Sequence, residues 1–448
     1  MYDVYCISAG QSDVKKEPNV INKKNMYLNY GLLGLASQIN DENLSTIQLQ
    51  GHFEEPEVFF EYCLNKGIAN TRYPVFISMP SFYALSWLKV FTKLLKNKAK
   101  IKKIVLGGRW VIDGHPEKIK ALLPDVDVII DGLGDDKILS LLNREPLKYS
   151  TQVSSLNYKI LDERKLYQPS LEVSRGCGMS CNFCQEGNEK LQPLKEPFVI
   201  TSEVKSILLN DELINMTPYF ESSMFVSNQQ WLENLIAQRE IYSQNYLWRT
   251  ESRVDSISPK LIPYLAKAGL RVLDLGLESA SHKQLTSMGK SKKPEKYLEK
   301  ASSLINTAYE FGISVKINIL LYAGETSQSI QETFNWLDKH RKFIKGVSIG
   351  PVIAFGWDYK KKNFMDELIS NGASIYSGNQ IIGVSHINLS SKIDHNKALD
   401  ISRELSCEFM DAKSYYFLKS FSYFPRNYSW ENFNSDVNNQ PSNYSFSI

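Results

Sequence analysis

Short apolar runs alternate with amphipathic helical patterns over the first 150 residues. A bounded apolar run of about four to eight residues predicts a buried strand, whereas apolar positions at every third or fourth residue predict a helix. The β-α-β-α order, with short connections, predicts a parallel Rossmann-like sheet over residues 1–150 whose ligands bind beyond the carboxyl ends of the strands. The predicted strands are residues 4–8, 46–49, 74–79 and 103–106, and the predicted helices are residues 30–39, 57–64 and 83–95.

The same alternation returns between residues 165 and 353. Repeated βα units predict a partial TIM-like barrel with its active site at the carboxyl ends of the strands. The fold class is therefore α/β in both parts of the chain. The predicted strands here are residues 171–173, 223–226, 247–249, 272–277, 315–321 and 346–349, and a helix is predicted over residues 230–243.

Residues 354–448 form a third region, in which helical patterns dominate. A helix predicted over residues 396–420 is expected to close the mouth of the barrel. Residues 425–448 are rich in Asn, Ser and aromatic residues with few charges. This composition favours a flexible, poorly ordered tail. The alternative is a segment that grips an extended substrate peptide.

Composition and charge narrow the class of protein. The 448 residues are 43% hydrophobic and 12% aromatic, which is typical of globular domains and not of disordered chains. The formal net charge is +3, and no dense basic block occurs, so nucleic-acid and membrane surfaces are not expected as partners. The sequence shows neither a signal-peptide pattern at Met1 nor a long apolar span, so we expect a cytoplasmic protein.

Three of the six cysteines lie within eight residues and carry the most specific chemistry. Cys177, Cys181 and Cys184 have C-x3-C-x2-C spacing directly after a predicted strand. Iron-sulfur clusters are normally held by four cysteine thiolates, so three thiolates leave one iron of a 4Fe-4S cluster open to a ligand. A zinc site that lacks its fourth ligand and unrelated buried thiols are the alternatives.

The segment of residues 174–184, with Phe183 before the third cysteine, resembles the signature of the radical S-adenosylmethionine (SAM) superfamily. This resemblance implies a 4Fe-4S cluster whose open iron binds SAM. It also implies that one electron, from a donor such as flavodoxin or ferredoxin, splits SAM into a 5′-deoxyadenosyl radical. That radical would abstract hydrogen from a substrate.

Three later segments occur in the order that the same superfamily shows. Residues 248–255 (WRTESRVD) resemble its fourth strand, residues 276–281 (GLESAS) its glycine-acid-serine stretch, and residues 317–326 (INILLYAGET) the strand beside adenine. The resemblance implies that these segments hold SAM. The candidates are Glu278, Ser279 and Arg253, with Phe183 and Ile319 beside the adenine. The alternatives are an Arg253–Glu278 salt bridge and a core role for Ile319.

The N-terminal region resembles the cobalamin-binding domain that precedes the barrel in one branch of the superfamily. The match includes Gly107 and Gly108 after the fourth strand. It implies bound cobalamin, and the alternative is a scaffold that has lost this cofactor. Asp113 and His115 form a D-x-H pair, but Lys118 replaces the glycine of the cobalamin motif and the pair follows the wrong strand. We therefore do not expect His115 to bind cobalt.

The number of cysteines limits the reactions that can come after hydrogen abstraction. Only Cys407 lies beyond Cys184, so an auxiliary cluster and sulfur insertion are not expected. With cobalamin, the expected reaction is C-methylation of a natural product or a ribosomal peptide. Without it, Cys407 could donate hydrogen in a peptide epimerase, although a lone buried cysteine also packs in cores. An iron-sulfur sensor without enzymatic activity is the third interpretation.

Overall fold

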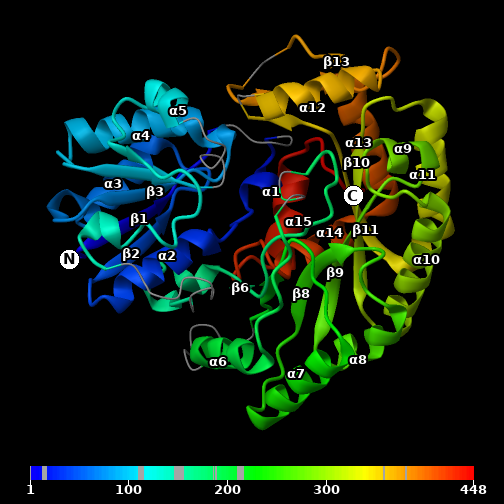
Figure 1. Ribbon diagram of the computed structural model, residues 1–448, viewed down its shortest axis with the longest axis horizontal. Helices are drawn as coiled ribbons and strands as arrows, with labels where there is room; N and C mark the ends of the chain where they lie inside the picture. Colours follow the sequence, from blue (N-terminus) through cyan, green and yellow to red (C-terminus); the bar gives the residue numbers. More distant parts are fainter. Residues whose placement is uncertain are drawn as a thin grey trace. The chain divides into compact units, whose positions relative to one another are not determined.

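The computed structural model describes residues 2–12, 18–108, 116–145, 156–184, 186, 189–208, 216–356, 359–378 and 381–448. Asp113 and His115 lie outside the described residues. The chain forms two compact units (Figure 1). Unit 1 comprises Met1–Pro18, Asn22–Tyr167 and Ile381–Gly383. Unit 2 comprises Asn19–Ile21, Gln168–Gln380 and Val384–Ile448.

Unit 1 is built on a parallel five-stranded sheet in the order β2-β1-β3-β4-β5. This is a doubly wound order, in which the strand order reverses between β1 and β3 and makes a switch point there. All five residues of β1 are buried, as expected for a strand covered on both faces. The strands are β1 (Val4–Ser8), β2 (Thr46–Gln50), β3 (Val75–Ser78), β4 (Ile104–Gly107) and β5 (Val128–Ile129), and the main helices are α2 (Tyr30–Asp41), α3 (Pro56–Asn65), α4 (Leu85–Asn97) and α5 (Pro116–Leu122).

Asn29 ties the carboxyl ends of three strands in unit 1 through its side chain and its backbone N–H. Asn29 caps α2 by accepting from the backbone N–H of Leu32, at 3.1 Å. Its Nδ2 donates to the hydroxyls of Ser8 (3.1 Å) and Ser78 (3.0 Å), and its backbone N–H donates to Gln50 Oε1 (2.9 Å). The switch point is therefore lined by small, neutral polar groups.

Unit 2 contains a parallel six-stranded sheet in the order β11-β10-β9-β8-β7-β6. Among the described residues no strand pair joins β6 to β11, so this sheet is open, as a partial barrel would be. Helices follow the strands and cover the sheet (Figure 1). The strands are β6 (Ser170–Glu172), β7 (Tyr219–Glu221), β8 (Trp248–Arg253), β9 (Leu270–Glu278), β10 (Ser314–Leu321) and β11 (Ile344–Pro351), and the helices are α6 (Pro197–Leu208), α7 (Gln229–Ile241), α8 (Ile262–Lys267), α9 (His282–Ser287), α10 (Pro294–Glu310) and α11 (Ser327–Lys339).

The second strand of this sheet differs from the prediction. We expected it at residues 223–226, but β7 ends at Glu221. The apolar residues Met224 and Phe225 are buried, which explains the misleading pattern, but they lie in a connection that leads to α7. The alternating α/β architecture itself is confirmed.

The C-terminal region packs into unit 2. Its helices are α12 (Tyr359–Ser370), α13 (His395–Phe409), α14 (Ala412–Ser420) and α15 (Trp430–Asn439). The predicted helix over residues 396–420 is broken, because Met410 is extended and Asp411 caps α14 by accepting from Ser414 N at 2.7 Å.

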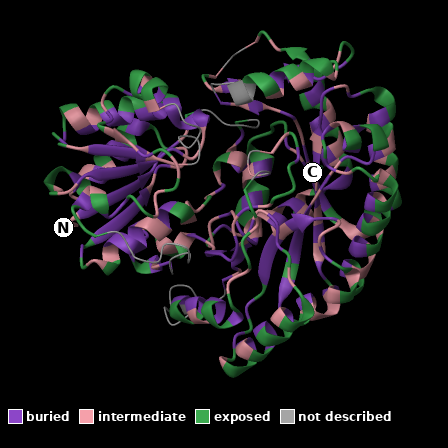
Figure 2. Cartoon of the chain, in the orientation of Figure 1, coloured by how far each residue is buried: buried purple, intermediate pink, exposed green. Residues whose placement is uncertain are grey.

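The prediction of a flexible tail over residues 425–448 is wrong. Tyr444 and Phe446 are 4% and 3% exposed, and they join a core cluster with Phe433 of α15 and Val272 of β9. Aromatic residues spaced among Asn and Ser therefore form a buried face here. The prediction placed too much weight on the polar residues between them. In Figure 2 the strands of both sheets are mostly purple, the colour of buried residues.

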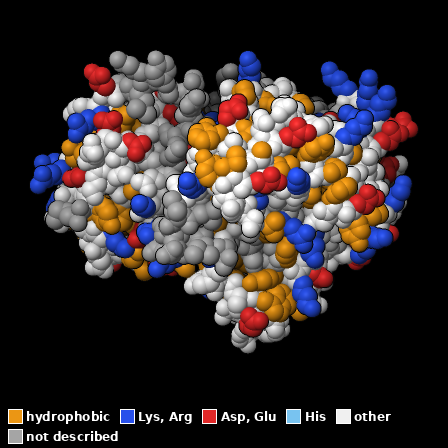
Figure 3. All heavy atoms as spheres, turned by 90° about the horizontal axis from the view of Figure 1, so that it is seen from below, with side chains coloured by type: hydrophobic (Ala, Val, Ile, Leu, Met, Phe, Trp, Pro, Cys, Tyr) orange, Lys and Arg blue, Asp and Glu red, His pale blue; other side chains and the backbone are white. Residues whose placement is uncertain are grey.

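Basic and acidic side chains are interspersed on the face shown in Figure 3, together with apolar ones. Within the described part of that face they form no continuous basic stripe. No helix formed by the described residues is long and apolar enough to cross a bilayer.

Candidate active site

The cysteine loop follows β6 in a conformation that suits its glycines. Gly176 and Gly178 have φ of 76° and 69°, and Ser180 has φ of 51°. A Cβ at Gly176 would lie 2.4 Å from the carbonyl oxygen of Lys190, so a larger residue cannot be accommodated there. The spacing of glycines among the cysteines therefore sets the path of the backbone.

Backbone contacts fix the loop at both ends. The N–H of Cys177 donates to the carbonyl of Glu189 (2.9 Å), and the N–H of Asn182 donates to the carbonyl of Met288 (3.2 Å). The side chain of Asn182 also donates to Glu367 Oε1, at 2.7 Å. The loop is thus held between two segments that are far apart in sequence.

Each of the three thiols faces a hydrogen-bond donor. Burial raises the pKa of Cys177 and of Cys184, while the backbone N–H groups of Met179 and Glu186, respectively, act in the opposite direction. Cys181 is 8% exposed, and its Sγ accepts from Arg253 Nη1 at 3.2 Å. Donors directed at sulfur stabilise the thiolate, which is the form that binds iron.

The three thiols also influence one another electrostatically, since the charges of Cys177 and Cys181 raise the pKa of Cys184 in addition to the larger effect of burial. Within the described residues, no group of three or more His, Cys, Asp or Glu side chains converges on a single metal ion. A cubane places its thiolates on different irons, so it does not require such convergence. Three thiolates on different irons are the donor set expected for a 4Fe-4S cluster with one iron open to another ligand.

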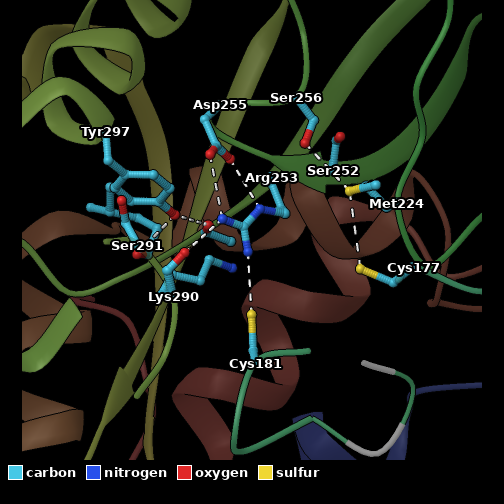
Figure 4. A network of polar contacts seen from close by, with 12 residues as sticks. Cys177, Cys181, Met224, Ser252, Arg253, Asp255, Ser256, Lys290, Ser291 and Tyr297 are labelled. Carbon is cyan, nitrogen blue, oxygen red and sulfur yellow. Dashed lines mark hydrogen bonds and ion pairs between the residues drawn. The ribbon is translucent and has the colours of Figure 1, made fainter. Parts of the chain in front are cut away.

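Arg253, the last residue of β8, lies at the centre of the network in Figure 4. Besides Cys181, it contacts Asp255 (Nε to Oδ1, 3.0 Å; Nη2 to Oδ2, 3.4 Å) and the carbonyl of Lys290 (Nη2, 2.7 Å). Its guanidinium also lies 5.8 Å from the centre of the Tyr297 ring. Arg253 is only 8% exposed, so these contacts hold it in one orientation.

Lys290 joins Arg253 to two other predicted residues. Its Nζ lies 3.0 Å from Glu278 Oε1 and 5.9 Å from the centre of the Phe183 ring. Glu278 ends β9 with φ of 66°, next to a register shift between β9 and β10. A glutamate rarely adopts this backbone conformation, and such residues concentrate at functional sites. The alternative of a direct Arg253–Glu278 salt bridge is not what the structure shows, because Arg253 pairs with Asp255 and Glu278 pairs with Lys290.

Ser279 and Ile319 are less accessible. Ser279 is 1% exposed, and its hydroxyl contacts Thr333 Oγ1 (3.2 Å) and accepts from Ser281 N (3.1 Å). Ile319 is 5% exposed and lies opposite Glu278 in the sheet register. The contacts of Ser279 are those of a structural hydroxyl, and its role toward SAM stays a prediction, as does that of Ile319.

Charged side chains form a row across one face of the sheet, which we call the polar face. Glu172 pairs with Glu221, Glu251 pairs with Asp274, and Asp274 pairs with Lys316 in the strand register. Tyr219 pairs with Arg249, which brings Glu221 and Glu251, two residues further on, to the same level. The members of the polar face are Glu172, Glu221, Arg249, Glu251, Arg253, Asp274 and Lys316.

The carboxylates of the polar face differ in protonation. Burial raises the pKa of Glu221 to about 8 and that of Glu251 to about 7. Burial would also raise the pKa of Asp274, but the charges of Arg249 and Lys316 outweigh it and hold this pKa below its usual value. Arg249 donates to both oxygens of Asp274, at 2.5 and 2.8 Å. Near neutral pH the face therefore holds the ion pairs of Asp274 with Arg249 and Lys316, together with two carboxyls, Glu221 and Glu251, that can bind or release a proton.

The comparison with protein families identifies the middle of the chain. Residues 171–337 match the family model for the Radical SAM superfamily. The chain carries a radical SAM domain. The match contains the cysteine loop, Arg253, Glu278 and Ile319, so the predicted family is confirmed on the segment that holds the candidate site.

Curated relatives of this radical SAM domain belong to different reaction classes. The anaerobic magnesium-protoporphyrin IX monomethyl ester cyclase of Rubrivivax gelatinosus is 25% identical over 45% of this chain and 37% of its own length. The ribosomal protein uS12 methylthiotransferase RimO of Helicobacter pylori is 33% identical over 20% of this chain and 21% of its own length. The chain spans well under half the length of these relatives.

Solved structures share the fold of both units. The cobalamin-dependent SAM radical enzyme OxsB has a TM-score of 0.59 and 16% identity, over 83% of this chain and 55% of OxsB. The radical SAM methyltransferase TsrM from Kitasatospora setae has a TM-score of 0.58 and 14% identity, over 97% of this chain and 88% of TsrM. At such identities the likeness shows the fold, in which a Rossmann-like unit precedes the radical SAM domain along the chain.

Cys407 lies in the C-terminal region that follows the radical SAM domain. Its Sγ is 3.3 Å from the carbonyl oxygen of Tyr444, which it reaches as a donor. Burial raises the pKa of Cys407, and the charge of Arg403 on the same helix lowers it by a smaller amount. Arg403 is not a residue of the cysteine loop. The thiol therefore has the surroundings of a packing residue, and its role as a hydrogen donor stays a prediction.

A small hollow opens beside the cysteine loop of the radical SAM domain. Its volume is about 250 Å³, and it lies beyond the carboxyl ends of β6 and β7. One of its walls is Met224, whose Sδ lies 4.0 Å from Cys177 Sγ. It is lined by Ser174, Leu191, Gln192, Pro193, Leu194, Met224 and Val226.

Sequence reasoning missed several residues of this site. Asp255 lies two residues after Arg253, inside a segment that resembles the superfamily, so its acidic side chain could have been noticed. Lys290 and Met224 belong to no recognisable motif. Asn228 caps α7 by accepting from the backbone N–H of Trp231 at 2.9 Å.

Proposed function

We propose that this chain is a cobalamin-dependent radical SAM enzyme that methylates a carbon atom of a natural product or of a ribosomal peptide. The observation that carries the proposal is the three-thiol loop, in which each sulfur faces a donor and Cys181 contacts Arg253. The methyltransferase TsrM, whose fold extends over 97% of this chain, supports the choice of methyl transfer.

Cys177, Cys181 and Cys184 would hold a 4Fe-4S cluster in this proposal. When bound, the cluster and SAM supply a 5′-deoxyadenosyl radical for hydrogen abstraction, and cobalamin supplies the methyl group. The protein itself orients the bound molecules and excludes water. A donor such as flavodoxin or ferredoxin would deliver the electron.

The charged residues of unit 2 have distinct roles in the proposal. Glu278, fixed by Lys290 at 3.0 Å, presents a carboxylate suited to the ammonium group of SAM. Phe183, beside Lys290, supplies an apolar ring for the adenine. Glu221 and Glu251 can hold or release a proton near neutral pH, because burial raises their pKa values to about 8 and 7.

The carboxyl edge of unit 1 fits a large, mostly neutral ligand such as cobalamin. Ser8, Ser78 and Asn29 offer neutral polar groups there. Gly108 has φ of 114°, and a Cβ on it would lie 2.5 Å from the carbonyl oxygen of Met79. A larger residue is therefore not accommodated here, and the backbone at this edge carries no side chain. These residues would line the cofactor after β1, β3 and β4.

Full-length protein reconstituted anaerobically with iron, sulfide and hydroxocobalamin tests the proposal. We expect cobalt to remain bound after desalting, and methyl-labelled SAM to yield labelled methylcobalamin. Iron without cobalt, and no labelled methylcobalamin, would overturn methyl transfer while leaving radical SAM chemistry in place. Iron without SAM cleavage would favour an iron-sulfur sensor, and zinc in place of iron without SAM cleavage would favour a zinc protein.

Peptide epimerisation with Cys407 as hydrogen donor is the second candidate. The contact of Cys407 with Tyr444 favours packing instead. In deuterium oxide, an epimerase would place solvent deuterium at the product carbon, and Cys407→Ala would remove it. A product heavier by one methyl group and insensitive to Cys407→Ala would exclude this candidate.

A further inference from the structure

The three thiols of the cysteine loop have unequal surroundings. Cys177 and Cys184 face backbone donors, and the charges of Arg253 and Lys290 also act to lower the pKa of Cys177. Cys181 is in direct contact with the guanidinium of Arg253, with Nη1 3.2 Å from Sγ. Cys181 and Arg253 are each 8% exposed, so water screens this contact only weakly. One ligand position of the proposed cluster is therefore next to a permanent, buried positive charge.

The position of Arg253 is fixed by groups other than the thiol. Asp255 accepts from Nε (3.0 Å) and from Nη2 (3.4 Å), and the carbonyl of Lys290 accepts from Nη2 (2.7 Å). With the contact to Cys181, these account for four of the five N–H groups of a guanidinium. A bidentate clamp on the carboxylate of SAM needs two parallel N–H groups, so Arg253 would first have to release a partner.

We propose that Arg253 is a positioning residue that donates a charged hydrogen bond to the Cys181 thiolate and thereby raises the reduction potential of the cluster. Reduction adds one electron, and so one negative charge, to the cluster. A fixed cation and a directed N–H stabilise that added charge, and hydrogen bonds to sulfur are among the determinants of cluster potentials. The inference rests on the proposed function, in which Cys181 is a cluster ligand.

The chain offers a matched control on another thiol. Met224 Sδ lies 4.0 Å from Cys177 Sγ, but it is an uncharged thioether. Met224→Leu conserves volume and polarity in the core. It should therefore leave the potential unchanged, although it alters the surroundings of a neighbouring ligand.

The experiment is a potentiometric titration of the reconstituted full-length protein without SAM, with dithionite as the one-electron reductant and the signal of the reduced cluster as the readout. Arg253→Met should shift the midpoint to a more negative potential. We expect at least about a tenfold fall in the equilibrium constant for reduction, which corresponds to 59 mV. Arg253→Lys, which keeps the charge but loses the fork geometry, should shift it less.

An unchanged midpoint in Arg253→Met, with full iron content, would overturn the inference and leave the proposed function intact. Loss of iron in both Arg253 variants would also overturn it, because Arg253 would then be needed to assemble the cluster. If Arg253→Met alone loses iron, the midpoint potential of Arg253→Lys is the test. A shift to a more negative potential supports the inference, and an unchanged midpoint overturns it. An unmodified protein that forms no 4Fe-4S cluster would instead refute the proposed function.

Discussion

The two parallel sheets of this chain follow the same strand-helix alternation but differ in where they place charge. In unit 1, all residues of β1 and β3 are buried, and the polar groups at the carboxyl edge are neutral. In unit 2, charged residues occupy consecutive strands on the polar face. A doubly wound sheet is covered by helices on both faces and must be apolar, whereas a partial barrel can turn one face toward a reaction site.

The difference indicates that the sheet of unit 1 is mainly structural, whereas the polar face of unit 2 is suited to a reaction. Buried charges are costly unless they are paired, so a sheet that retains several of them must pair them or use them. Arg249 and Asp274 are paired, while Glu221 and Glu251 have raised pKa values. Perturbed carboxyls of this kind are typical of functional sites.

The largest expected effect is the loss of iron when a cysteine of the loop in unit 2 is replaced, in contrast to a cysteine of unit 1. Alanine at Cys177, Cys181 or Cys184 should abolish the iron content and SAM cleavage, because two thiolates cannot hold a cubane of defined geometry. Cys63→Ala is the matched control, since Cys63 is fully buried in unit 1. Iron analysis after reconstitution checks both, and full iron in any variant of the loop would contradict the assignment.

The ion pair of the polar face should carry the next largest effect. Asp274→Asn leaves Arg249, which is 1% exposed, without its counter-ion. Breaking a buried pair in this way should lower the free energy of unfolding by about 3–5 kcal/mol. Denaturant unfolding of the unmodified protein and of Asp274→Asn measures this loss of stability. The exposed pair Arg341–Glu408 provides the control, because Glu408→Gln should cost less than about 1 kcal/mol. Equal effects would show that the polar face is as hydrated as the surface.

Glu278→Gln should weaken SAM binding about tenfold or more while the iron content is unchanged, because a contact with a charged group is typically worth about 1.5–3 kcal/mol. Ser279→Ala should weaken it less, since the Ser279 hydroxyl already contacts Thr333. Calorimetric titration of the reconstituted protein with SAM provides both affinities. Unchanged affinity in Glu278→Gln would remove Glu278 from the SAM site.

The last test concerns the pH dependence of stability. Burial raises the pKa of Glu221 from 4.5 to about 8, so in this range the folded protein binds more protons than the unfolded chain. Through this group, the free energy of unfolding therefore falls as the pH rises from 4.5 to about 8. Glu221→Gln should make that dependence less steep. Denaturant unfolding at several pH values tests it, and an unchanged slope would show that Glu221 ionises normally.

The sequence predicted those features that short, local patterns determine. Apolar runs predicted β1, β3 and β10, and the cysteine spacing with its glycines predicted the loop and its family. It did not predict Lys290 as the link between Arg253 and Glu278, because that link depends on how distant segments meet in space. Buried aromatics such as Tyr444 and Phe446 were misread for the same reason.

The central claim is that the cysteine loop holds a 4Fe-4S cluster with an iron open to SAM. The most direct test is the paramagnetic resonance signal of the reduced, anaerobically reconstituted protein before and after addition of SAM, together with its metal content. The account predicts about four irons per chain and a signal that changes when SAM binds the open iron. Zinc in place of iron, or a cluster whose signal is indifferent to SAM, would contradict it.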